Sequence, residues 1–142
     1  MKVLIRAPQL TDIPAIVRLI SELASTAGET SPITADYVAR YLTAPSSRVL
    51  LAEVDEDVVG VLSYSIRPDL YHAGDCCLIE ELIVNHKWRS RGVGRALMAE
   101  LRLRLAGCKE VSVGVAAQNT AALKFYRRQG LVEEAVLLEK HL

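Results

Sequence analysis

Apolar residues recur along this chain with two periods, every second residue in some stretches and every third or fourth in others. The first period is typical of strands and the second of amphipathic helices. Residues 11–25 show the helical period most clearly, because five apolar side chains share one face there: Ile13, Ile16, Val17, Ile20 and Leu23. The patterns predict a strand at 2–7, helices at 11–25 and 34–43, strands at 48–54, 58–66 and 76–84, a helix at 92–105, a strand at 110–115, a helix at 119–130 and a strand at 131–139.

Capping and turn residues support several of these boundaries. Thr11 can cap the first helix, and Pro14 falls in its first turn, where proline is tolerated. The acidic residues 55–57 join two β-branched strands and predict a hairpin. Residues 24–32 and 67–75 lack a clear period and are predicted as loops.

The predicted order of elements, β-α-α-β-β-β-α-β-α-β, indicates a single domain over residues 1–142. An antiparallel hairpin half is joined to a β-α-β crossover through one mixed, mostly antiparallel sheet, flanked by about four helices. We therefore expect an α/β protein of the α+β type.

Composition and charge exclude several classes of protein. The chain has 142 residues, of which 51% are apolar, so it can bury a substantial core. Basic and acidic residues number 17 each, and the absence of net charge argues against a nucleic-acid partner held by long-range attraction. No apolar run approaches membrane-spanning length, and Arg6 interrupts the N-terminal run before it could serve as a signal peptide. We expect a cytoplasmic protein with no nucleic-acid and no membrane partner.

The cysteines and histidines show no metal-ligand spacing. Cys76, Cys77 and Cys108 are predicted to be reduced and inert, and neighbouring Cys76 and Cys77 point to opposite faces of a strand. His72 and the other histidines have no pairing that suggests a nucleophile or a metal site. The expectation is that the protein holds no metal.

The stretch Arg89-Ser90-Arg91-Gly92-Val93-Gly94-Arg95 carries the strongest functional signal. A strand leads into it and a helix leads out of it, so unpaired backbone N–H groups and the positive end of a helix dipole meet there. The glycines allow a ligand to approach the backbone closely, and the side chains of Arg89 and Arg91 can add charge-assisted contacts. The stretch predicts a site for a phosphate or a pyrophosphate.

Two familiar phosphate motifs do not fit this spacing. A Walker loop requires a lysine that is absent here. The dinucleotide fingerprint requires a small residue at the sixth position, where Leu97 stands, and an acid after the next strand, which ends without one.

The pattern Arg89-x-x-Gly92-x-Gly94 and its lead-in Leu82-x-Val84 resemble the motif of the GNAT superfamily, the GCN5-related N-acetyltransferases. A second segment also resembles that family, and it consists of Asn119, Ala122, Phe125, Tyr126 and Gly130. The resemblance covers nearly the whole chain, because the order of the elements fits as well. Two positions depart from the pattern: His86 stands where many members have proline, and Leu131 replaces a phenylalanine.

The resemblance implies acetyl-coenzyme A as co-substrate, with its pyrophosphate on the amides of residues 91–95. In the family, the strand before the loop splays from the next strand and binds the pantetheine arm through its backbone, which here implies Leu82, Ile83 and Val84. Asn119, Ala122 and Tyr126 share one helix face that would line the same ligand. Asn119 is equally interpreted as a simple helix cap.

Three residues are candidates for catalysis of amide formation. The acceptor ammonium, with a pKa of roughly 10, must lose a proton, and the departing thiolate must gain one. Glu80 and Glu81 lie on an otherwise apolar strand and should point to opposite faces, so at most one should face the acyl carbon. The resemblance favours Glu80 as base, and Glu81 could instead bind substrate or pair with an arginine. Tyr126 is the candidate general acid.

The acceptor is expected between the first helices and the loop at 67–75, with Tyr37, Tyr71, Glu80 and Glu81 as substrate-binding residues. Other residues that could line this region are Glu29, Tyr41, Asp69, His72 and Asp75. We expect an N-acetyltransferase acting on a small-molecule amine by direct attack in a ternary complex. The alternatives are acetylation of a protein N-terminus or lysine, a non-catalytic coenzyme A-binding sensor or scaffold, and, more remotely, a nucleotide-binding regulatory domain. A homodimer is implied only by the family.

Overall fold

The computed structural model describes residues 1–142 and contains one five-stranded sheet in the order β1-β2-β3-β4-β5. The first four strands are antiparallel neighbours, and β4 pairs with β5 in parallel. The strands are β1 Leu4–Arg6, β2 Ser47–Val54, β3 Asp57–Asp69, β4 Gly74–Val84 and β5 Glu110–Val113. The α-helices are α1 Ile13–Thr26, α2 Ala35–Tyr41, α3 Val93–Arg104 and α4 Thr120–Arg128, with short 3-10 helices η1 Leu10–Asp12 and η2 His86–Trp88. The predicted fold class is confirmed.

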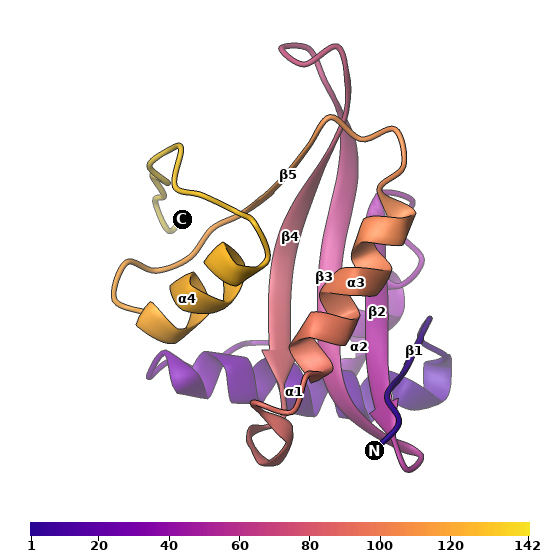
Figure 1. The fold of residues 1–142 in the computed structure, drawn as a ribbon. Coiled ribbons are helices and arrows are strands. Elements are labelled where there is room, and N and C mark those ends of the chain that lie inside the picture. Colours follow the sequence, from indigo (N-terminus) through magenta and orange to yellow (C-terminus); the bar gives the residue numbers. More distant parts are fainter.

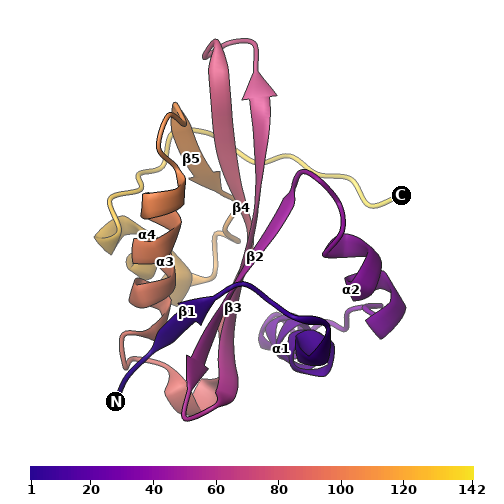
Figure 2. The same ribbon diagram turned by 90° about the vertical axis from the view of Figure 1, so that its right-hand side faces the viewer.

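The helices cover the sheet from both sides (Figures 1 and 2). The helices α1 and α2 lie on one face, where Ile16, Leu19 and Val38 pack against buried residues of β2, β3 and β4. The helix α3 lies on the opposite face, where Leu97 and Met98 join a larger cluster that also contains Tyr126 of α4. The strands β2, β3 and β4 therefore contribute residues to two separate cores, one on each face of the sheet.

The start of α1 differs from the prediction. Thr11 lies inside η1 rather than capping α1, and the residue that precedes α1 is Asp12. Asp12 is buried, and a bidentate ion pair with Arg6 compensates its charge, with Nη1–Oδ2 and Nη2–Oδ1 distances of 2.8 and 2.9 Å. Arg6 also donates to Glu53 at 2.9 Å, so this network joins β1, β2 and the first helical turn.

The two hairpins of the central sheet differ in how well they were predicted. Asp55 and Glu56 turn the β2–β3 hairpin with positive φ angles of 50° and 68°, as a tight hairpin turn requires. The predicted loop at 67–75 is wrong at both ends, because β3 continues to Asp69 and β4 begins at Gly74. This second hairpin projects beyond the helices (Figure 1).

The prediction of a last strand at 131–139 is wrong, since this segment has no strand structure. Its acidic and apolar residues come in blocks rather than alternating, and Glu133 forms an ion pair with Arg127 of α4. Leu137 nevertheless lies against Gly114, the residue that follows β5, because a Cβ on Gly114 would lie 3.0 Å from its side chain. The segment and α3, α4 and β5 together line a cavity of about 650 Å³.

None of the helices has both the length and the apolar character needed to cross a membrane. All three cysteines are free, as predicted.

Candidate active site

The predicted phosphate loop forms a tight turn into α3. Ser90 and Gly92 have positive φ angles of 61° and 84°, and Gly92 is the N-cap of the helix. The amides of Val93, Gly94 and Arg95 lie in the first turn of α3, where no helical acceptor precedes them. The twelve-residue α3 therefore directs free N–H groups and the positive end of its dipole toward this loop.

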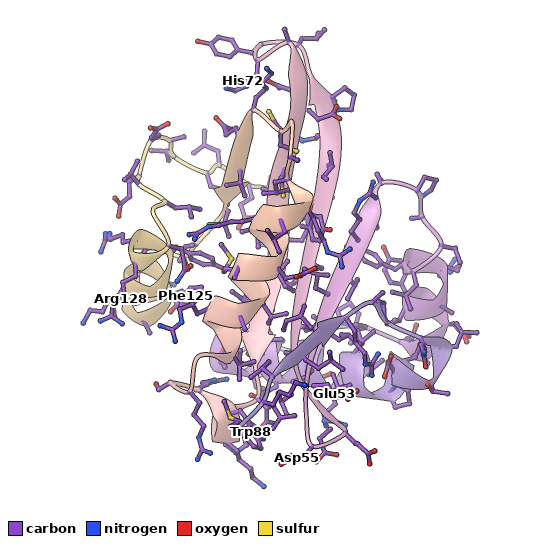
Figure 3. All side chains as sticks on the ribbon, turned by 45° about the vertical axis from the view of Figure 1, so that its right-hand side comes forward. Glu53, Asp55, His72, Trp88, Phe125 and Arg128 are labelled. Carbon is purple, nitrogen blue, oxygen red and sulfur yellow. The ribbon has the colours of Figure 1, made fainter.

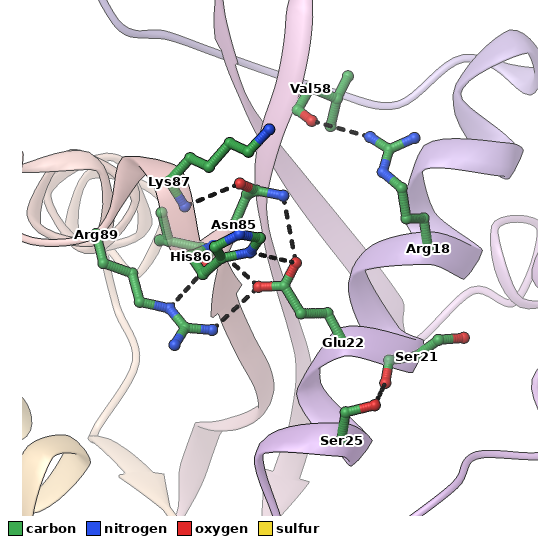
Figure 4. Close-up of polar contacts among 10 residues, drawn as sticks. Arg18, Ser21, Glu22, Ser25, Val58, Asn85, His86, Lys87 and Arg89 are labelled. Carbon is green, nitrogen blue, oxygen red and sulfur yellow. Dashed lines mark hydrogen bonds and ion pairs between the residues drawn. The ribbon is translucent and has the colours of Figure 1, made fainter.

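The side chain of Arg89 is exposed, but hydrogen bonds hold it against the protein. Its Nε donates to the carbonyl of Val84 at 3.0 Å, and its Nη2 donates to Oε2 of Glu22 at 3.0 Å (Figure 4). Glu22, on α1, also accepts from the amide of His86 and from the side chain of Asn85. One carboxylate thus ties α1 to the end of β4 and to the loop, which gives Arg89 a structural partner.

The other arginines of the loop stay near its surface. The guanidinium of Arg91 lies over the ring of Trp88, 5.2 Å from its centroid. The Nη2 of Arg95 is 3.4 Å from the point where a Cβ on Gly92 would lie. The charge of both side chains therefore remains close to the free amides.

Gly94 has a packing role that the sequence did not predict. A Cβ on this residue would lie 3.2 Å from the ring of Phe125, so glycine allows α4 to pack closely on α3. Figure 3 labels Phe125 on α4, and Trp88 lies at the end of the molecule where the phosphate loop begins. Gly94 therefore couples the loop to α4, whereas Gly92 supplies the positive φ.

The strands β4 and β5 part as the resemblance implied. They pair only through Cys76–Ile79 and Glu110–Val113, and β4 then continues alone to Val84. The β5-facing edge of residues 80–84 consequently has no strand beside it. Leu82 and Val84 face the α3 core, and Ile83 is buried against the α1 side. This edge can accept an extended ligand as a strand would.

A β-bulge in β4 lies at the same point. Ser63 pairs with Glu81 but Tyr64 pairs with Ile79, which leaves Glu80 as the extra residue. The bulge reverses the alternation of side chains, because Ile79 faces the α3 core while Ile83 faces the α1 core. A bulged strand also bends, which accounts for β5 leaving β4 after Ile79.

The prediction that Glu80 and Glu81 point to opposite faces is therefore wrong. Glu81 accepts a hydrogen bond from the hydroxyl of Ser63, and Glu80 accepts one from Ser65 at 3.1 Å. Ser63 and Ser65 are two residues apart on one strand and share a face. Both carboxylates lie on the face that α1 and α2 cover, and Glu80 is the more exposed.

A cavity of about 460 Å³ lies between this face and the helices α1 and α2. Its polar residues include Ser63, Glu81, Tyr37 and Tyr41, and most of its lining is apolar. Burial raises the pKa of Tyr41, and the nearby carboxylates of Glu81 and Glu80 add to that shift. The sequence did not point to Ser63 or Arg40 as lining residues. Ser63 is identified by its position opposite Glu81 in the pairing of β3 with β4.

Several predicted lining residues lie elsewhere. Tyr71 is 91% exposed in the turn between β3 and β4, and Asp69, His72 and Asp75 belong to the same hairpin end. Figure 3 labels His72 at the opposite end of the molecule from Trp88. Glu29 is exposed and does not line the cavity either. The structure thus brings Tyr37, Tyr41 and Glu81 together and leaves Tyr71 outside.

Tyr126 lies on the other face of the sheet, in the α3 core. Its side chain is only 9% exposed, and burial raises its pKa to about 12. Ala122 and Phe125 of the same helix flank this core, and Asn119 caps α4 by accepting from the amide of Ala122 at 3.1 Å. Glu81 and Tyr126 are therefore on opposite faces, and the gap where β4 and β5 part lies between them.

These features suit a long ligand with a phosphate group and an extended amide-rich arm. The α3 amides and nearby arginines match a pyrophosphate, and the unpaired β4 edge matches the amides of a pantetheine arm. The gap after Ile79 gives such an arm a route toward Glu81. The residues present therefore fit acetyl-coenzyme A.

Comparison with known proteins agrees with this fit. The sequence profile of the acetyltransferase (GNAT) family matches residues 14–131. The chain therefore belongs to the GNAT family and is an acetyltransferase, and members of this family use acetyl-coenzyme A. No curated protein sequence matches the chain significantly.

Solved structures share the fold. A transcriptional regulator from Bacillus halodurans aligns with a TM-score of 0.88 at 23% identity, over 99% of this chain and 100% of that one. An aminoglycoside acetyltransferase from an uncultured soil metagenomic sample, in complex with sisomicin, aligns with a TM-score of 0.83 at 21% identity, over 99% and 96%. Ribosomal-protein-alanine N-acetyltransferase from Brucella melitensis biovar Abortus aligns with a TM-score of 0.83 at 17% identity, over 99% and 100%.

Proposed function

We propose that this acetyltransferase moves an acetyl group from acetyl-coenzyme A to a primary amine on a small molecule, by direct attack in a ternary complex. The observation that carries the proposal is the position of Glu81. Its carboxylate lines the cavity under α1 and α2, two residues beyond the last β4–β5 pair. An amine in this cavity would meet an acyl group arriving through the gap.

The cavity indicates the kind of acceptor. Its volume of about 460 Å³ falls in the range typical of small-ligand pockets. Most of its lining is apolar, and the guanidinium of Arg40 already lies over the ring of Tyr37, so an ammonium inside it would depend on Glu81 and on the ring of Tyr41. The predicted acceptor is therefore a compact molecule with one amine and an apolar or aromatic body.

Glu81 is the proposed general base that accepts a proton from the acceptor amine. Its carboxylate is held by the Ser63 hydroxyl, which fixes one oxygen and leaves the other for the ammonium. Glu81 takes a proton from that ammonium, directly or through one water, and the neutral nitrogen then forms its bond to the acyl carbon. Glu80 stays at the rim as a second negative charge that attracts the cation.

Tyr126 is the proposed general acid that donates a proton to the departing thiolate. Bound acetyl-coenzyme A supplies an activated acyl carbon on a thioester, whose carbon–sulfur bond breaks as the new carbon–nitrogen bond forms. The raised pKa of Tyr126 keeps its hydroxyl protonated at neutral pH, so it can donate to the departing sulfur and regain a proton from solvent. The amide near Leu82, on the unpaired edge of β4, can donate to the carbonyl oxygen as negative charge develops.

The solved neighbours include acetyltransferases for both kinds of acceptor, since one is in complex with sisomicin and another is named for a ribosomal-protein alanine. The volume and apolar lining of the cavity favour the small-molecule acceptor here. A protein N-terminus or lysine, and a non-catalytic coenzyme A-binding role, are outcomes that the following experiment separates.

The test is an assay of coenzyme A release with a panel of small amines and amine-terminated peptides. At least one small amine should be turned over, and Glu81→Gln should lower kcat/KM by about 100-fold or more. Glu80→Gln is the matched control and should lower it only a few-fold, because Glu80 lies at the rim. Turnover of peptides alone would move the acceptor to proteins, and tight acetyl-coenzyme A binding without any turnover would favour the sensor role.

A further inference from the structure

The end of the β3–β4 hairpin gathers side chains that are common ligands of transition metals. Asp69, His72 and Cys76 each present one donor atom, and these three atoms lie within 4.8 Å of one another. None of them belongs to the acetyltransferase site, which lies further along β4. From Cys76 to Val84 the strand spans about 27 Å.

Sheet register explains why these residues meet although their spacing in the sequence matches no metal motif. Cys76 pairs with Arg67 on one side and with Glu110 on the other, and Asp69 lies two residues beyond Arg67, opposite Gly74. Paired residues point to the same face, so Asp69, Cys76 and Glu110 share a face of the sheet. Gly74 adds no side chain to that row, and the turn at 70–73 folds His72 back onto it.

His72 is held by carboxylates at both ring nitrogens. Nδ1 contacts Oδ2 of Asp69, and Nε2 lies 3.2 Å from Oε2 of Glu110. A neutral imidazole has one N–H donor and one nitrogen with a free lone pair. If Nε2 carries the hydrogen and points it toward Glu110, the lone pair of Nδ1 is available on the side of Asp69 and Cys76.

This arrangement matches the way proteins hold zinc. A metal-bound histidine usually donates its other N–H to a carboxylate, which is the position of Glu110. Thiolate, imidazole and carboxylate together are donors typical of Zn²⁺ and Co²⁺ rather than of Mg²⁺ or Ca²⁺. Arg67 lies 3.8 Å from Oδ1 of Asp69, which leaves Oδ2 facing His72.

We propose that Asp69, His72 and Cys76 form a binding site for a divalent transition-metal ion, with Zn²⁺ as the natural choice and Glu110 as the residue that orients His72. A water molecule completes a four-coordinate shell. Binding replaces the thiol proton of Cys76, which passes to the buffer. The ion fixes the projecting hairpin to the start of β5, and no step of acetyl transfer uses it.

The experiment titrates the untagged, chelator-treated full chain with Co²⁺ and follows the thiolate-to-cobalt absorption in the near ultraviolet. One Co²⁺ per chain should bind, and Zn²⁺ should displace it. Cys76→Ser should abolish the band, His72→Gln should abolish saturable binding, and Glu110→Gln should weaken binding about 10- to 100-fold. Cys108→Ser and His141→Ala are controls outside the cluster and should bind like the unaltered chain.

Circular dichroism distinguishes lost binding from lost folding, and His72→Gln is the variant least able to disturb the core, because His72 is only partly buried and lies outside both core clusters. Zn²⁺ should also raise the melting temperature of the unaltered chain but not that of His72→Gln. Absence of a cobalt band in the unaltered chain would overturn the proposal, as would an undiminished band in Cys76→Ser. Neither outcome bears on the proposed acetyl transfer, which is assayed separately.

Discussion

The carboxylates of Glu80 and Glu81 lie on the same face of the sheet, hydrogen-bonded to Ser65 and Ser63 respectively. Neighbouring residues of a regular strand would point to opposite faces, and the bulge at Glu80 removes that alternation. The two acids consequently lie on the side of the sheet that holds the cavity beneath α1 and α2. Only Glu81 lines that cavity.

Ser63→Ala should impair the enzyme more than Ser65→Ala does. Ser63 is 4% exposed and donates to Glu81, so its loss leaves a half-buried carboxylate without its partner. We expect kcat/KM to fall about tenfold and the free energy of unfolding to fall by about 1–3 kcal/mol. Steady-state kinetics and urea unfolding measure these effects, and equal effects of the two substitutions would contradict the assignment of Glu81.

Gly92→Ala should weaken binding of acetyl-coenzyme A. Its φ of +84° strains any side chain, at a cost of about 1–2 kcal/mol, and relief of that strain would displace the α3 amides. Gly107→Ala is the matched control, because Gly107 has a φ of +86°, lies after the other end of α3 and has open space around it. Both variants should lose similar stability in urea unfolding, but only Gly92→Ala should raise the dissociation constant measured by calorimetry.

Tyr126→Phe should lower kcat while leaving the fold intact. The hydroxyl is the only group removed, and the ring keeps its place in the α3 core. Because burial raises the pKa of Tyr126 to about 12, the hydroxyl remains protonated across the usual assay range, and no alkaline loss of rate below about pH 11 should come from it. A pH–rate profile of both proteins tests this. Full activity of Tyr126→Phe would remove the tyrosine from its proposed role.

Acid should destabilise the protein through Asp12. The ion pair with Arg6 holds the pKa of Asp12 below its usual range, so the folded state favours the ionised form. This contribution is fully present above the unfolded pKa of about 4 and is lost as pH falls through the lower folded pKa. The free energy of unfolding should be measured at several values from about pH 2 to about pH 6. It should fall more steeply with acid in the unaltered chain than in Asp12→Asn. Parallel curves would contradict the assignment.

The β2–β3 turn offers a stabilising substitution. Glu56 has a φ of 68°, a conformation that disfavours a residue with a Cβ and favours glycine. Glu56→Gly should therefore raise the free energy of unfolding by about 1 kcal/mol. Denaturant unfolding measures the change, and no effect on acetyl transfer is expected because the turn lies away from Glu81.

The turn that leads into α3 could be predicted from sequence because its signals are local. A strand, two glycines and a helix start follow one another within a few residues, and the structure places Gly92 at the N-cap of α3 as expected. The role of Gly94 could not be predicted, since its neighbour Phe125 is distant in sequence. Local spacing thus located the loop but not the packing that holds it.

The orientation of Glu80 relative to Glu81 could not be predicted either, because it depends on how β4 pairs with β3. Whether β4 carries an extra residue is decided by its pairing with Ser63 and Tyr64, which no local pattern reveals. The cluster at His72 likewise arises from the register between β3, β4 and β5. The prediction of a strand at 131–139 was wrong, because apolar residues alone do not provide a neighbouring strand to pair with.

The most direct test of the account is a crystal structure with acetyl-coenzyme A and an amine selected by turnover. We predict the pyrophosphate on the amides of residues 91–95, the pantetheine arm along the free edge of β4, and the amine nitrogen within hydrogen-bond distance of Glu81. A thioester bound away from the start of α3, or an amine outside the cavity that Glu81 lines, would contradict it.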